Sequence, residues 1–163
     1  MLDTRTRKLT LAGILVAVAV LGGLFSFPVL GSRCAPVQHL VNILAAVFLG
    51  PVWAVGVAFA ASLLRNISGL GSLMAFPGSM IGALCCGIVY HCTRRIGITC
   101  LAEALGTGIL GALAAYPVAA VLMGLNPTSY TVYILPFLIS TGVGSAAAFL
   151  LLRFLLPQMG WRH

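Results

Sequence analysis

Long apolar runs alternate with short polar interruptions along this chain, a pattern typical of helices that are buried on all sides. The main breaks are the polar stretches 33–42 and 65–72 and the Gly-Pro pair at 50–51. A helix that spans a membrane needs about 20 apolar residues. The pattern therefore predicts six membrane helices in one all-α domain, at residues 9–30, 36–49, 52–64, 73–90, 98–123 and 132–156.

The first apolar run follows three basic residues and so resembles a secretory signal. It is longer than the hydrophobic region of such signals and lacks a small-x-small exit. We therefore expect it to remain as the first helix.

The second and third predicted helices are short, so a single helix over 37–64 is a real alternative. Positive charge decides between the two, because Lys and Arg concentrate in cytoplasmic loops. With a turn at 50–51, only Arg33 and Arg65 lie outside. With one long helix, the pair Arg94-Arg95 moves outside and the bias disappears. Six helices with both termini in the cytoplasm are the better interpretation.

Composition supports an integral membrane protein. The 163 residues are 61% hydrophobic and only 7% charged, and the mean hydropathy is +1.13, which leaves too little polar surface for a soluble domain. The net charge of +7 comes from basic residues at segment ends rather than along one face, so nucleic acid is not expected as a partner. The five cysteines show no metal-ligand spacing, and we expect neither a metal nor a cofactor.

The polar run 33–42 is the strongest candidate for a ligand site. Gln38 and Asn42 are four residues apart and share one helical face, with His39 beside them. Buried polar side chains need partners, which either a ligand or an internal network with Arg65 and Asn66 supplies. We favour a ligand and include Arg65 and Asn66 in its site. Phe76, Ser79 and Tyr116 are further candidates at a similar depth.

Glu103 is the sole acidic residue predicted within the hydrocarbon region. It either carries protons in a coupled carrier or pairs with Arg94 or Arg95, and its predicted depth favours the pairing. His39 has no evident acidic partner and no carboxylate pair is present, so enzyme chemistry is not expected. Lys8 is the only lysine, which excludes ATP binding through a Walker A loop.

Several segments together resemble the ThiW family. They are the run 33–39 with Asn42, the step 64–66, the long run 71–84 that includes Phe76-Pro77-Gly78-Ser79, and the run 106–109 with Tyr116-Pro117. ThiW proteins are thiazole-specific substrate-binding subunits (S components) of energy-coupling factor (ECF) transporters. The resemblance implies a six-helix S component in a prokaryotic cell membrane that captures a thiamin precursor, hydroxyethylthiazole, from outside.

The resemblance also implies partners. An S component docks on a transmembrane coupling protein that carries two cytoplasmic ATPases, through small residues spaced by four on the first helix. Here these residues are Gly13 and Ala17, although the family has alanine at the first position. The alternatives are a stand-alone proton-coupled carrier that uses Glu103 and an S component for another vitamin.

Overall fold

The computed structural model describes residues 5–29 and 32–158, and most of them are helical. The long helices are α1 (Arg5–Gly22), α2 (Pro36–Phe48), α3 (Pro51–Ile67), α4 (Ala75–Thr93) and α7 (Ile134–Gln158). Between α4 and α7 the chain forms one continuous helical segment of α5 (Ile96–Leu105), the π-helix η2 (Gly106–Gly111), α6 (Ala112–Pro117) and the π-helix η3 (Val118–Leu122). Within the described residues, six helical segments overlap the six predicted ranges, although their ends differ.

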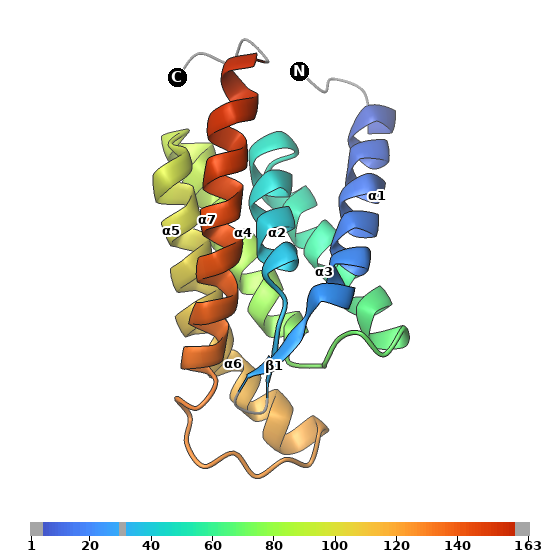
Figure 1. The fold of residues 1–163 in the computed structure, drawn as a ribbon, viewed down its shortest axis with the longest axis vertical. Helices are drawn as coiled ribbons and strands as arrows, with labels where there is room; N and C mark the ends of the chain where they lie inside the picture. The colour runs from blue at the N-terminus through green and yellow to red at the C-terminus, as the bar shows by residue number, and fades with distance from the viewer. Residues whose placement is uncertain (1–4, 30–31, 159–163) are drawn as a thin grey trace.

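The helices form a bundle in which the start of α1 and the end of α7 lie at the same end (Figure 1). A short hairpin and α6 lie toward the opposite end. Within the described residues, four helical segments are long and apolar enough to cross a membrane: Arg5–Phe25, Ala75–Thr93, Ile96–Leu122 and Ile134–Gln158. α2 and α3 are apolar but shorter.

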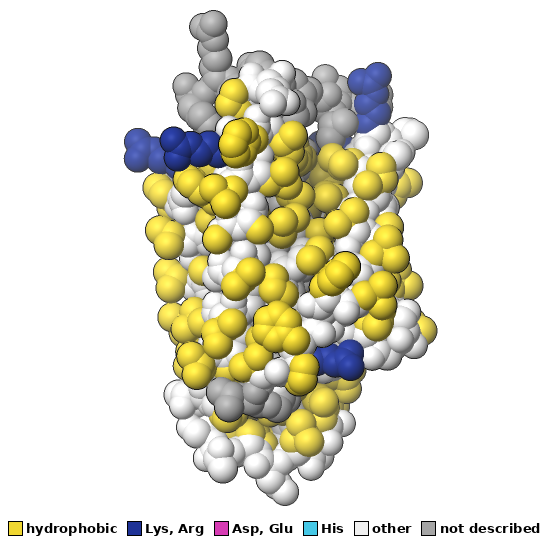
Figure 2. Space-filling model, viewed as in Figure 1, with side chains coloured by type: hydrophobic (Ala, Val, Ile, Leu, Met, Phe, Trp, Pro, Cys, Tyr) yellow, Lys and Arg dark blue, Asp and Glu magenta, His cyan; other side chains and the backbone are white. Residues whose placement is uncertain are grey.

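The outer surface is apolar along most of the bundle. Hydrophobic side chains cover the middle of the molecule, and basic side chains gather mainly near the end where α1 begins and α7 ends (Figure 2). Leu9, Leu101 and Phe154 are each more than 60% exposed. An exposed apolar surface of this extent is what lipid requires and water does not favour.

The turn between α2 and α3 follows the local sequence. Gly50 adopts a φ of 94°, which is a left-handed conformation that glycine accepts readily. Pro51 then occupies the first turn of α3, where its missing N–H costs nothing. The break predicted at 50–51 is confirmed, and the single helix over 37–64 is excluded.

The predicted end of the first helix at residue 30 is wrong. α1 ends at Gly22 and is followed by the 3₁₀ turn η1 (Gly23–Phe25) and a hairpin of β1 (Phe27–Val29) with β2 (Ser32–Cys34). Two adjacent glycines weaken the helix, and Pro28 disfavours helical backbone at the residue before it. The hairpin places β2 next to the start of α2 and beside α7.

Candidate functional site

A cavity of about 40 Å³ lies inside the bundle next to the hairpin. Its wall comes from β2, α2, α3, α4, η2 and α7, so residues far apart in the chain share it. Four of the predicted site residues line this cavity: Gln38, His39, Arg65 and Ser79. A cavity of this size and polarity has room for more than one water molecule.

The other predicted residues lie outside the cavity wall. Asn42 is fully buried one turn deeper on α2, and Asn66 donates from its amide to the carbonyl oxygens of Ser62 and Ser72. Phe76 packs against Phe59 with ring centroids 5.7 Å apart. The Tyr116 ring lies 3.9 Å from that of Tyr130.

Thr107, Ser140 and Phe137 line the cavity and were not predicted from the sequence. Thr107 lies in η2, and the other two lie on α7. The hydroxyl of Ser140 accepts a hydrogen bond from the backbone N–H of Ala35 at 2.8 Å, which holds the start of α2 against α7. A π-helical turn is frequent at functional sites, but the sequence alone does not reveal that η2 is one.

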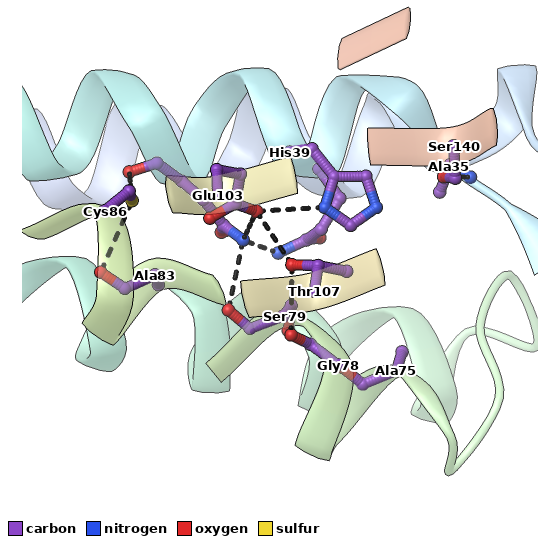
Figure 3. A network of polar contacts seen from close by, with 12 residues as sticks. Ala35, His39, Ala75, Gly78, Ser79, Ala83, Cys86, Glu103, Thr107 and Ser140 are labelled. Atoms are coloured by element: carbon purple, nitrogen blue, oxygen red, sulfur yellow. Dashed lines mark hydrogen bonds and ion pairs between the residues drawn. The ribbon is translucent and has the colours of Figure 1, made fainter. Parts of the chain in front are cut away.

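Glu103 is the centre of a buried polar network below the cavity (Figure 3). Its Oε1 atom lies 3.1 Å from His39 Nδ1 and accepts hydrogen bonds from Asn42 Nδ2 at 3.0 Å and Thr107 Oγ1 at 3.1 Å. The carboxylate therefore connects α2, α5 and η2.

The predicted pairing of Glu103 with Arg94 or Arg95 is wrong. Among the described residues, the side chain within ion-pair distance of Glu103 is His39 rather than an arginine, and Arg94 lies over the ring of Tyr90 instead. Glu103 is two turns inside α5 and faces the core, whereas both arginines lie at the turn before α5. The expectation that His39 has no acidic partner is also wrong, because Glu103 Oε1 lies 3.1 Å from its Nδ1 atom.

Arg65 supplies a buried positive charge at the opposite wall. It is 2% exposed, and it donates from Nη1 to Gln38 Oε1 at 3.2 Å and from Nη2 to the carbonyl of Leu70 at 3.3 Å. Gln38 Nε2 then lies 3.4 Å from Asn42 Oδ1, and Asn42 reaches Glu103. Two amides thus link the buried cation to the buried anion, which lowers the cost of burying both charges.

A family model described as "Thiamine-precursor transporter protein (ThiW)" matches residues 9–157. The chain belongs to the ThiW family. No curated protein and no solved structure matches it. Family membership indicates a thiamine-precursor transporter protein, and the apolar helices agree with a membrane protein.

For a ThiW-family transporter, the cavity wall offers both hydrogen-bonding and apolar surface. Gln38, His39 and Arg65 provide polar atoms, whereas Ala75 and Phe137 provide apolar surface. Apolar surface with a few polar groups is the usual lining of small-molecule sites.

Cys34 lies at the end of β2, between the cavity-lining residues Arg33 and Ala35. Its thiol lies 3.1 Å from the carbonyl oxygen of Pro136 and is buried. Burial raises the pKa of this thiol above its ordinary value. Cys34 therefore stays protonated at neutral pH and acts here as a small packing residue.

Proposed function

We propose that this ThiW-family chain is the substrate-binding S component of an ECF-type importer and that it captures hydroxyethylthiazole. The family match carries the proposal, and the cavity with its few polar side chains supports it. The chain would span the membrane six times with both termini in the cytoplasm. α2 and α3 are short, so the hairpin before α2 and the Gly50-Pro51 turn between them would complete their crossings. The cavity would open toward the outside.

The size of the cavity favours a one-ring precursor over thiamin itself. Its volume is about 40 Å³, well below the roughly 150 Å³ of a cavity that holds benzene. Either ligand therefore requires the bundle to open, and two linked rings require more opening than one. Hydroxyethylthiazole has about nine heavy atoms, and the best small ligands gain about 1.5 kcal/mol per atom. Tight binding is therefore possible without an ionic bond between ligand and protein.

In the proposed pose, Gln38, His39, Arg65 and Ser79 contact the ligand, because they line the cavity. Asn42 and Asn66 do not contact the ligand in this pose. They hold the cavity-lining segments in place through hydrogen bonds to Glu103 and to the carbonyl oxygen of Ser72. Phe76 and Tyr116 contribute only if the site widens on binding, because each packs against another aromatic ring here.

The test is titration of the purified chain in detergent with hydroxyethylthiazole, hydroxymethylpyrimidine and thiamin. We expect the thiazole to bind most tightly. Stronger binding of the pyrimidine or of thiamin would reassign the ligand. Failure of all three would refute a thiamin-precursor S component.

Docking on a coupling protein with two ATPases is the second part of the proposal. Gly13 and Ala17 are exposed on α1, and no other side chain would meet a Cβ atom at Gly13 within 4 Å. Ala17→Leu should reduce co-purification with the coupling protein and leave thiazole binding unchanged. Ala147→Leu, on the exposed face of α7, is the matched control and should reduce neither.

A stand-alone proton-coupled carrier is the second candidate, and the buried Glu103–His39 pair favours it. A carboxylate inside a membrane helix is commonly a proton site. Vesicles that contain this chain alone would then accumulate hydroxyethylthiazole when a proton gradient is imposed, and Glu103→Gln would abolish the uptake. Uptake that requires ATP and the partner proteins would exclude the carrier.

A further inference from the structure

The two ring nitrogens of His39 have different surroundings. Nδ1 lies 3.1 Å from Glu103 Oε1, whereas Nε2 points away from Glu103 and no hydrogen bond to it is recorded within the described residues (Figure 3). His39 also lines the cavity. Nε2 is therefore the ring nitrogen that remains for a ligand.

Glu103 determines what Nε2 can do. An ionised carboxylate only accepts hydrogen bonds, so a neutral His39 carries its proton on Nδ1 and leaves a lone pair on Nε2. Asn42 and Thr107 donate to the same Oε1 atom and hold the carboxylate in place. Asn42 also donates to the backbone carbonyl oxygen of Ser79 on α4, and this second hydrogen bond fixes the orientation of the Asn42 side chain.

Arg65 and Glu103 carry one buried charge of each sign and are linked through Gln38 and Asn42. The guanidinium of Arg65 only donates hydrogen bonds, and it lines the cavity together with His39. The cavity thus has a donor-rich wall at Arg65 and an acceptor at His39 Nε2.

We propose that Glu103 is a positioning residue that makes His39 Nε2 an acceptor for the substrate hydroxyl, so that the site selects a thiazole whose side chain is an alcohol. This inference rests on the proposed function, because it takes the thiazole as the ligand. It assigns a role in specificity to Glu103, which does not itself line the cavity.

Three ligands test the proposal: hydroxyethylthiazole, the analogue with hydrogen in place of the hydroxyl, and the methyl ether. The ether has an acceptor oxygen but no donor. Wild-type protein should bind both analogues about 10- to 100-fold more weakly than the alcohol, which is the usual effect of one lost hydrogen bond in a buried site.

Glu103→Met removes the acceptor from Nδ1 and leaves the N–H of Asn42 and the hydroxyl of Thr107 beside it. The proton of His39 should then move to Nε2, which becomes a donor. The ratio between alcohol and ether affinities should fall to about 3 or less, with the hydrogen analogue still weak. Loss of packing alone would weaken all three ligands by the same factor.

Glu103→Gln is the conservative variant, because all three donors in the network meet a single oxygen and glutamine keeps one oxygen. It should restore the preference for the alcohol that Glu103→Met loses, with weaker binding overall. His39→Leu should bind the alcohol and the hydrogen analogue equally. His91→Leu, at an exposed position near the end of α4, is the matched histidine control and should retain the wild-type ratios.

The outcomes separate the two proposals. If the wild-type protein does not bind hydroxyethylthiazole, the proposed function fails. If it binds the thiazole but Glu103→Met keeps the wild-type ratios, or His39→Leu keeps the preference for the alcohol, only the role of Glu103 fails. Should Glu103→Met not fold, ¹⁵N NMR of the histidines in wild-type protein decides, because a proton on Nε2 of His39 would overturn the inference.

Discussion

Replacing Gly82 with alanine would insert a methyl group into the polar network. Gly82 lies on α4 opposite Glu103 and Thr107. A Cβ atom at this position would lie 2.7 Å from Glu103 Oε2 and 2.9 Å from its Cδ, and it would overlap Thr107 Oγ1. Because both side chains are fully or almost fully buried, neither can move aside without cost.

The size of the effect follows from two terms. Overpacking a tight interior costs about 1–3 kcal/mol, and each displaced hydrogen bond adds about 1 kcal/mol. We expect Gly82→Ala to lower the free energy of unfolding by about 2–4 kcal/mol. For a chain of this length, that corresponds to a Tm lower by roughly 5–15 °C.

The assay is thermal unfolding in detergent, followed by circular dichroism, with and without hydroxyethylthiazole. Gly56→Ala is the matched control, because Gly56 is exposed on α3 and nothing lies within 4 Å of its added Cβ. That control should be neutral or stabilising by up to about 1 kcal/mol. Equal Tm values for the two variants would refute the close approach of α4 to the carboxylate.

Three more outcomes follow from the site. Asn42→Ala should weaken thiazole binding by about 1–3 kcal/mol, because it leaves buried partners unsatisfied; unchanged affinity in a titration would make Asn42 purely structural. Arg65→Lys should weaken binding at least tenfold, since an ammonium group cannot reproduce both guanidinium contacts, whereas Arg153→Lys at an exposed position should have no effect. In single-cysteine variants at pH 8, maleimide should label the exposed Cys92 faster than Cys34, whose raised pKa keeps the thiolate scarce; equal rates would contradict the burial of Cys34.

Local signals in the sequence were sufficient for most helices. Pro36 and Pro51 lie in the first turns of α2 and α3, and the spacing of Gln38 and Asn42 placed both on one helical face. The hairpin was missed because residues 23–30 are as apolar as the helix before them. There, two glycines and Pro28 outweigh hydropathy, which does not distinguish a short apolar strand from a helix.

The Glu103–His39 contact was missed for a different reason. These residues are 64 positions apart, and their meeting depends on how α2 packs against α5, which no local pattern encodes. The spacing of Glu103 and Thr107 by four residues was a usable signal for a shared face. It does not identify the helix that this face contacts.

The π-helical turn η2 (Gly106–Gly111) determines how this chain responds to a change in residue number at that point. Such a turn holds about one residue more than an α-turn, whereas successive residues of an α-helix are rotated by about 100°. Deleting one residue within η2 would therefore let the turn relax to α-helix with little rotation of the residues after it. Ala112, Ala115 and Ala119, which are fully buried, would keep facing the core. Deleting one residue from the regular helix α5 would instead rotate the residues after it by about 100°, so a deletion should be tolerated better in η2 than in α5.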